Sequence, residues 1–260
     1  MPTIIPIPAF TDNYIWLVRE GAHAVVVDPG DAAPVLAYLE RERLTLTAIL
    51  NTHHHGDHVG GNAALVAHAA VPVYGPAREQ IPGRTRGVGA GDVVALPEVG
   101  LTLEVLDVPG HTAGHIAWYA RDDGAAGSLA FVGDTLFAGG CGRVFEGTAD
   151  EMCASLARLA ALPATTRVYC AHEYTLSNLR FALDVLPGDS VLLERQAREQ
   201  AKRDRGVPTV PTTIAEERAS NPFLRTSVPR IVAAAEARAG RRLASSAEVF
   251  ATLREWKNQS

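Results

Sequence analysis

The sequence predicts an α/β protein whose last third is helical. Short runs rich in β-branched and other apolar residues follow one another from Ile4 to Ala171, with turns and helical stretches between them. From Thr175 onward, the composition becomes helical over longer stretches. At 260 residues, of which 47% are hydrophobic and 20% charged, the chain is long enough for one large domain and a smaller one.

The first β-rich runs are separated by the turn signals Thr11-Asp12-Asn13 and Glu20-Gly21. They predict strands at residues 4–7, 14–18 and 24–27, a helix at about 33–43, and a further strand at 46–50. Asp28 follows the third strand. The sequence leaves two readings of it open: a carboxylate that orients a ligand histidine, or an ordinary turn residue.

A dense group of metal-binding side chains follows the run Leu46–Leu50. Four of them lie within six positions: His53, His55, Asp57 and His58. In extended backbone, side chains two positions apart share a side, so His53, His55 and Asp57 are expected to face one way and His54 the other. Gly56 permits a turn, after which His58 can reach the same cavity as the chain enters a helix, expected at 62–70. This spacing predicts a metal site.

Three later runs also end at residues of ligand type. Leu101–Leu106 is followed by the turn Pro109-Gly110 and His111, Ser128–Gly133 by Asp134, and Arg167–Ala171 by His172. We favour His111 as a ligand because it repeats the order of strand and then ligand, and we assign His115 a structural role. Open sheets place their sites outside strand ends, so these loops are expected to converge. Residues 75–100 read as a loop with one short strand near Val93-Val94.

Imidazole and carboxylate together favour zinc, iron or manganese, since calcium and magnesium prefer oxygen ligands alone. The net charge of −5 gives no general attraction to nucleic acid or membrane. The N-terminus lacks a basic region and is broken by prolines, so we expect no signal peptide and a cytoplasmic protein. Three widely spaced cysteines argue against a disulfide framework.

The last third predicts helices at 175–186, 190–204 and 230–239. Ser245-Ser246-Ala247-Glu248 has the pattern of a capping box that opens a final helix through Trp256. Residues 207–213, which include Pro208 and Pro211, are expected to form a stiff connector.

Several motifs resemble known families. Thr52-His53-His54-His55-Gly56-Asp57-His58 resembles the THxHxDH signature of the metallo-β-lactamase superfamily, and the later ligands match it in type and order. More narrowly, four segments resemble the glyoxalase II (hydroxyacylglutathione hydrolase) family: Ile7–Tyr14, Gly140–Arg143, Cys170–Thr175 and Asn221–Arg225. This likeness covers nearly the whole chain.

The resemblance implies an αββα sandwich over residues 1–173 and a helical substrate-binding domain over residues 174–260. It implies two divalent metal ions, zinc before iron or manganese. His53, His55 and His111 would hold one ion, Asp57, His58 and His172 the other, and Asp134 would bridge them. Asp57 and Asp134 are then the catalytic carboxylates, and a bridging hydroxide would attack a thioester.

The implied substrate is S-D-lactoylglutathione, cleaved to glutathione and D-lactate by a monomer. Arg254 and Lys257 lie three apart, hence on one helix face, and would bind the glutathione carboxylates. Arg143 would add a third positive charge, and Tyr174 would hydrogen-bond the peptide backbone. The chain has Phe145 where the family often has tyrosine, which removes one hydroxyl contact of about 1 kcal/mol.

Five alternatives remain. The first is a persulfide dioxygenase with one iron, against which the cationic helical domain argues, and another is a different thioesterase of the superfamily. A metal-stabilised binding module is disfavoured because structural zinc sites are usually closed by cysteine and histidine. A secreted β-lactamase or an RNA-processing nuclease is disfavoured by the missing export signal and the acidic balance.

Overall fold

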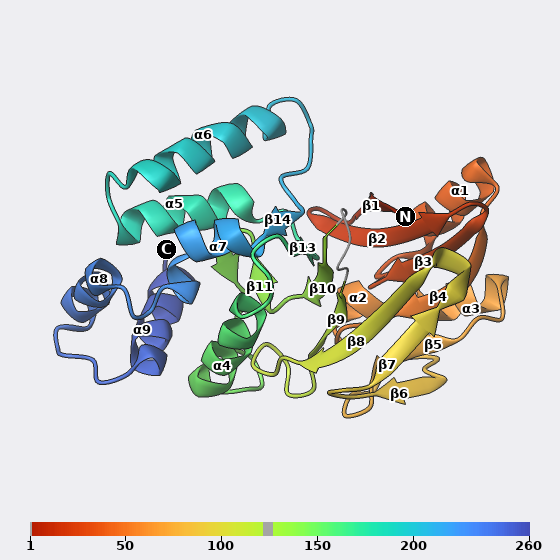
Figure 1. Cartoon of the computed structure of the whole chain (residues 1–260), viewed down its shortest axis with the longest axis horizontal. Helices are drawn as coiled ribbons and strands as arrows, with labels where there is room; N and C mark the ends of the chain where they lie inside the picture. The colour runs from red at the N-terminus through yellow and green to blue at the C-terminus, as the bar shows by residue number, and fades with distance from the viewer. Residues whose placement is uncertain (1, 122–126) are drawn as a thin grey trace.

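The computed structural model describes residues 2–121 and 127–260. Two six-stranded sheets form one part of the molecule, and the helices between residues 149 and 258 (α4 to α9) lie together beside them (Figure 1). The N-terminus lies beside the first sheet and the C-terminus among the helices that follow the second. Among the described residues, no helix is long and apolar enough to cross a membrane.

The first sheet has its strands in sequence order: β1 (Thr3–Ala9), β2 (Asn13–Glu20), β3 (His23–Val27), β4 (Thr45–Leu50), β5 (Val73–Pro76) and β6 (Arg86–Val88). The second has the order β14 (Thr212–Thr213), β13 (Arg167–Cys170), β10 (Leu129–Gly133), β9 (Ile116–Ala120), β8 (Leu101–Asp107) and β7 (Val93–Leu96). A small hairpin pairs β11 (Leu136–Phe137) with β12 (Gly140–Cys141).

Alternating side chains on the strands separate the core into two layers. Trp16 and Val18 of β2 point into the layer between the sheets, whereas Ile15 and Leu17 pack on the outer layer. The outer layer is closed by α1 (Ala32–Glu42) and α3 (Asn62–His68), which bury Val35, Leu39 and Leu65. This arrangement is the α/β sandwich that the sequence analysis expected.

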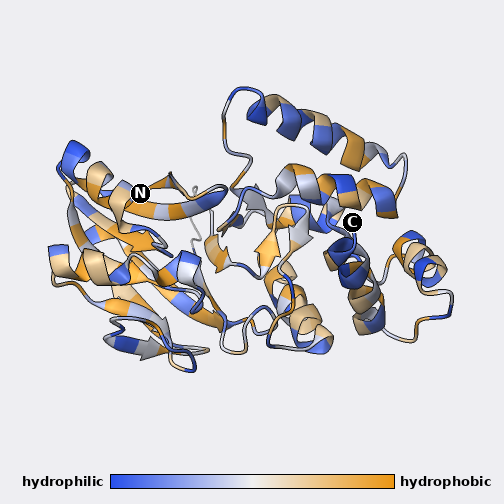
Figure 2. Cartoon of the chain, turned by 180° about the vertical axis from the view of Figure 1, so that it is seen from behind, coloured by the Kyte–Doolittle hydropathy of each residue, from blue (hydrophilic) through white to orange (hydrophobic). Residues whose placement is uncertain are grey.

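The remaining helices are η1 (Pro97–Val99), α2 (Gly56–Val59), α4 (Ala149–Ala160), α5 (Thr175–Val185), α6 (Ser190–Arg203), α7 (Ile214–Ser220), η2 (Pro222–Leu224), α8 (Pro229–Ala239) and α9 (Ser246–Asn258). Figure 2 shows hydrophobic residues along the central strands and a mixture of hydrophilic and hydrophobic residues along these helices. A helical C-terminal part was predicted and is confirmed.

Several local expectations were incomplete. Residues 75–100 contain β6 and β7 where one strand was predicted, and the connector 207–213 ends in β14. Helix α4 was not predicted, although Thr148 and Glu151 form a complete capping box at its start. At α9 only half of the expected box forms: Ser245 caps the Glu248 N–H, but the Glu248 carboxylate pairs with Arg241 instead.

Candidate metal centre and substrate cavity

The strand ends that carry the candidate ligands meet at one edge of the sandwich. Strand β3 is parallel to β4, and β10 is parallel to β13. Strand β8 runs antiparallel to β9, which runs antiparallel to β10, so β8 and β10 share a direction. An antiparallel bridge joins Asn13, at the start of β2, to His172, directly after β13, and β2 is antiparallel to β3, so β3 and β4 run in the direction of β13. The loops after β4, β8, β10 and β13 therefore leave from the same side, and their side chains approach one another.

The loop after β4 turns into α2 earlier than the alternation argument assumed. His53 and His55 lie in irregular backbone on one side, but Asp57 lies in the first turn of α2 and faces the other group of ligands. Alternation therefore fails for Asp57, because the backbone is no longer extended there. Gly56 begins α2 without a positive φ, and a Cβ there would meet nothing within 4 Å, so the turn does not depend on glycine at this position.

The loop is instead held by close backbone contact with the turn after β3. A Cβ at Gly30 would lie 1.9 Å from the Asp57 carbonyl oxygen, and one at Gly60 would lie 2.6 Å from the Gly30 carbonyl oxygen. Only glycine permits this approach. The Asn51 side chain, which is fully buried, donates to the His58 carbonyl over 2.9 Å and closes the loop from inside.

Three histidines form a first group. Nε2 of His53 lies 3.1 Å from Nδ1 of His55, and Nε2 of His111 lies 3.0 Å from the same atom. Burial is the largest cause that lowers the pKa of each of these imidazoles. They are therefore neutral near pH 7 and present lone pairs to a common point.

A second group consists of Asp57, His58 and His172. Oδ2 of Asp57 lies 3.5 Å from Nε2 of each histidine. Burial opposes the ionisation of Asp57, but the charge of His58 and a 3.0 Å hydrogen bond from Asn13 outweigh it, so the pKa of Asp57 is lowered. Its carboxylate is ionised and faces two imidazoles.

Asp134 lies between the two groups. Its Oδ1 is 3.4 Å from Nε2 of His58 and 3.3 Å from Nε2 of His172, whereas its Oδ2 is 3.4 Å from Nε2 of His111. Burial raises the pKa of Asp134, yet the nearby charges of His58 and His172 lower it well below its usual range. One oxygen of the same carboxylate thus faces each group.

The donor set fits a pair of metal ions. Zinc bonds of about 2.0–2.1 Å to histidine or carboxylate in a tetrahedron place two ligand atoms roughly 3.3 Å apart. The separations within and between the groups, 3.0–3.5 Å, agree with that spacing. Nε2 of His58 and Oδ1 of Asp134 are buried and have no hydrogen-bond partner among the described residues, as atoms facing a cation would.

Buried neighbours fix which ring nitrogen of each histidine is available. Thr52 Oγ1 donates to Asp28 over 2.7 Å and can therefore accept from Nδ1 of His53 at 3.0 Å. The Arg143 carbonyl lies 2.9 Å from Nδ1 of His111, and Asp12 lies 2.8 Å from Nδ1 of His172. The Nδ1–H of each of these three rings donates, so Nε2 is the nitrogen that His53, His111 and His172 would offer to a metal ion.

Asp28 completes this pattern. Its Oδ2 lies 3.1 Å from Nδ1 of His58, and its Oδ1 accepts from the Thr52 N–H over 2.7 Å. Of the two readings left open by the sequence, the structure supports a carboxylate that orients a histidine. Asp12 and Asn13 were read only as turn residues, because nothing local signals a contact with His172 or Asp57 far along the chain.

The two remaining histidines of the cluster lie outside both groups. His115 is buried, and its Nε2 accepts from the Asp134 N–H over 3.2 Å, in agreement with a structural role. His54 has Nδ1 2.9 Å from Glu79 and Nε2 3.2 Å from Glu146, and with His55 and Glu146 it forms a separate, more exposed group of possible ligands. These contacts connect the loop after β4 to the neighbouring loops that carry Glu79 and Glu146.

A cavity of about 920 Å³ opens from His111 and Asp134 towards the helical domain. Arg254 and Lys257 of α9 both line it, together with Arg143, Phe145 and Tyr174. Arg180 of α5 lines it as well, and sequence reasoning missed this residue because nothing distinguishes it from an ordinary helix-surface arginine. The cavity thus has a metal-binding end and a cationic end.

The two cations on α9 are largely buried. Arg254 is 6% exposed and donates to the Cys141 carbonyl over 2.8 Å. Lys257 donates to Asn178, and burial together with the charge of Arg254 lowers its pKa to about 8. Holding two cations together in a buried wall is unfavourable unless an anion joins them.

Three further residues line the space between these ends. The ring of Phe145, which is 61% exposed, lies 5.3 Å from the ring of His111. The ring of Tyr174 stacks on His172 at 4.7 Å, and burial followed by the charge of Asp12 raises the pKa of its hydroxyl. The Arg143 side chain is exposed at the rim. Phe145 and Tyr174 therefore border the first and second group, respectively.

Two family models together match nearly the whole chain. Residues 9–172 match the metallo-beta-lactamase superfamily model, and residues 173–260 match the model described as hydroxyacylglutathione hydrolase C-terminus. The chain is 56% identical over 262 residues to a hydroxyacylglutathione hydrolase of Alkalilimnicola ehrlichii, covering 100% of both. It is 50% identical over 258 residues to that of Nitrosomonas europaea, covering 99% of this chain and 96% of the relative.

A solved structure of similar fold holds two metals. The crystal structure of TTHA1623 in a di-iron-bound form superposes with a TM-score of 0.57 and 30% identity, covering 85% of this chain and 100% of that one.

Proposed function

Because the chain belongs to the hydroxyacylglutathione hydrolase family of the metallo-β-lactamase superfamily, we propose that it hydrolyses S-D-lactoylglutathione and related 2-hydroxyacylglutathiones to glutathione and the hydroxy acid. The observation that carries the proposal is one cavity that joins a two-part metal-ligand cluster to buried cations. A thioester carbonyl needs the first end, and the carboxylates of glutathione need the second.

We propose His53, His55 and His111 as ligands of one ion, Asp57, His58 and His172 as ligands of the other, and Asp134 as the bridge. When bound, such ions lower the pKa of a coordinated water to about 7 and so supply hydroxide at neutral pH. Zinc is our first choice, and iron or manganese suits the same donors. The di-iron form of the similar protein supports two ions in this arrangement.

The chain's own residues would then orient the substrate. Arg254 and Lys257 would bind a glutathione carboxylate, and Arg143 a second one, so that the thioester lies against His111 and Asp134. The exposed ring of Phe145 would cover the acyl end, and Tyr174 would hydrogen-bond the peptide. The leaving thiolate needs no strong acid. We further propose a cytoplasmic monomer whose domains meet near residue 173, as the family matches suggest.

Metal removal and a substrate panel test the proposal. Purified protein should hydrolyse S-D-lactoylglutathione, lose this activity after chelation, and regain it with about two equivalents of zinc. Acyl thioesters of cysteamine, which lack the carboxylates, should be poor substrates. Oxygen consumption with glutathione persulfide and one iron per chain, without thioester hydrolysis, would favour a persulfide dioxygenase and contradict the proposal.

A further inference from the structure

The β11–β12 hairpin connects the two ends of the cavity. Asp134 precedes it, and Arg143 follows it, with the Arg143 carbonyl accepting from His111 over 2.9 Å. Between them, the ring of Phe137 lies 5.8 Å from the ring of His172. A shift of this hairpin would move groups that touch both metal-ligand groups.

Glu217 of α7 holds the hairpin turn from behind. It is completely buried, and its two carboxylate oxygens face different partners. Oε1 accepts from Arg195 of α6 over 2.5 Å and from Thr212 of β14 over 2.7 Å. Oε2 accepts from the Gly139 N–H over 2.8 Å and from Asn221 over 2.9 Å, on the side of the hairpin. The carboxylate is therefore a joint between the two domains.

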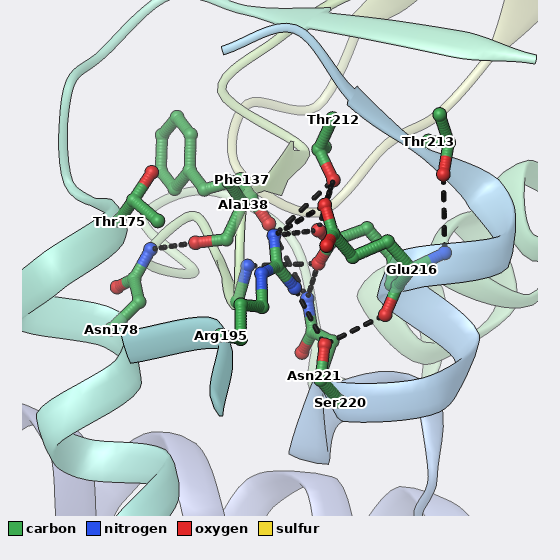
Figure 3. Close-up of polar contacts among 12 residues, drawn as sticks. Phe137, Ala138, Thr175, Asn178, Arg195, Thr212, Thr213, Glu216, Ser220 and Asn221 are labelled. Carbon is green, nitrogen blue, oxygen red and sulfur yellow. Dashed lines mark hydrogen bonds and ion pairs between the residues drawn. The ribbon is translucent and has the colours of Figure 1, made fainter. Parts of the chain in front are cut away.

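Asn221 makes the second contact of the same kind. Its Nδ2 donates to the Gly140 carbonyl over 2.9 Å and to the Phe137 carbonyl over 3.3 Å. Its Oδ1 accepts from the Phe223 N–H over 3.0 Å and so caps η2. Figure 3 shows Asn221 and Arg195 close together, with Phe137 and Ala138 of the hairpin region beside them.

The opposite side of the hairpin is held by the cavity wall itself. Asn178 of α5 donates to the Ala138 carbonyl over 2.9 Å and accepts from Lys257. Arg254 donates to the Cys141 carbonyl. Three helices of the C-terminal domain thus bind successive backbone groups of one short hairpin.

Stability alone does not account for the Arg195–Glu217 pair. Arg195 is 2% exposed, and replacing a buried ion pair by apolar residues of similar volume is often neutral or stabilising. An apolar residue at 217 could not accept from the Gly139 N–H. Glu217 therefore supplies an acceptor that the hairpin backbone needs and that an apolar residue could not replace.

We propose that Glu217 and Asn221 are positioning residues for the hydrolytic reaction: they fix the β11–β12 hairpin and, through it, the placement of Asp134 and of the Arg143 carbonyl on His111. The part concerning catalysis rests on the proposed function, whereas the part concerning the hairpin does not.

The test compares Asn221→Ser with Thr212→Val in the full-length, metal-loaded protein. Serine can still cap η2 but is too short to reach the hairpin carbonyls. Thr212→Val removes a hydrogen bond from the same Glu217 carboxylate on the side away from the hairpin. We expect Asn221→Ser to lower kcat/KM about 10-fold, the lower end of the range for residues that orient metal ligands. Thr212→Val should lower Tm with kcat and KM unchanged.

Amide hydrogen exchange of residues 134–143 supplies a readout that does not depend on turnover. Exchange there should be faster in Asn221→Ser and in Glu217→Gln, whose amide must turn a donor towards either Arg195 or Gly139, than in Thr212→Val. If Glu217→Gln does not fold, Asn221→Ser decides, since it leaves the buried charges paired.

Equal kcat, KM and exchange in Asn221→Ser and Thr212→Val would overturn the proposal. If the wild-type protein hydrolysed no glutathione thioester while exchange still rose in Asn221→Ser, the proposed function would fail and the anchoring of the hairpin would stand.

Discussion

On the sandwich side of the cavity, strand ends supply histidines whose second ring nitrogen is already bound by Thr52, Asp12, Asp28 or the Arg143 carbonyl. On the helical side, α9 supplies the cations Arg254 and Lys257, which line the cavity together with Arg180 and Asp184. Nε of Arg254 has no hydrogen-bond partner among the described residues, and the pKa of Lys257 is lowered. The sandwich side of the cavity, the sandwich wall, is therefore organised before the substrate binds. The helical side, the helical wall, is completed by the substrate.

The largest expected effect comes from the sandwich wall. Asp134→Asn removes a carboxylate that faces both ligand groups, and we expect kcat to fall by at least about 10³-fold, the upper range for loss of one preorganised electrostatic group. Metal content per chain should also fall. Asp150→Asn, at an exposed position on α4, is the control. An Asp134→Asn enzyme with wild-type kcat would show that the bridge is dispensable.

For the helical wall we expect a smaller effect, and we expect it in KM where the sandwich wall affects kcat. Arg254→Ala combined with Lys257→Ala removes two charged contacts remote from the reacting bond, and hydrogen bonds to charged groups contribute roughly 1.5–3 kcal/mol each. We expect KM for S-D-lactoylglutathione to rise about 100-fold, measured below the unfolding transition. We expect kcat to fall much less, and to fall at all only because Arg254 also holds the Cys141 carbonyl of the β11–β12 hairpin. Arg242→Ala is the control because that side chain is 94% exposed. A large loss of kcat at unchanged KM would mean that the two walls are not separate in function.

The smallest expected effect is a pH dependence of the helical wall alone. Lys257 is charged below its pKa of about 8 and loses its proton above it, so kcat/KM should fall as pH rises through 8. The pH profile of kcat reports the enzyme–substrate complex, in which a bound carboxylate favours the charged amine of Lys257. The fall in kcat should therefore occur at higher pH or be absent. In Lys257→Arg, the fall in kcat/KM should move to higher pH, since arginine stays charged. A fall at pH 8 that persists in Lys257→Arg belongs to another group.

The two walls also differ in how much of them could be predicted from the sequence. The loop after β4 holds several possible metal ligands within a few positions, which makes it easy to recognise. His111, Asp134 and His172 each follow an apolar run, so the expectation that ligands lie at strand ends identifies them. Asp12 and Asn13 escaped because their partners lie 160 and 44 positions away. Asp57 was assigned the wrong neighbours from geometry, because α2 begins before it.

On the helical wall, spacing alone placed Arg254 and Lys257 on one face but did not indicate burial. Arg180 and the Arg195–Glu217 pair carry no local signal, since charged residues on helices are usually solvated. Their environment is set by how α5, α6 and α7 pack. The ligand roles themselves stay predictions until metal is measured.

The contact between Gly30 and the Asp57 backbone restricts how the enzyme can be re-engineered. Libraries that randomise residue 30 or 60 to reshape acyl preference will mostly yield misfolded clones, because any added carbon there collides with a carbonyl group. Substitutions intended to change acyl preference are better made at Phe145. This residue borders the cavity from an exposed position, so its size can change without moving the loop after β4.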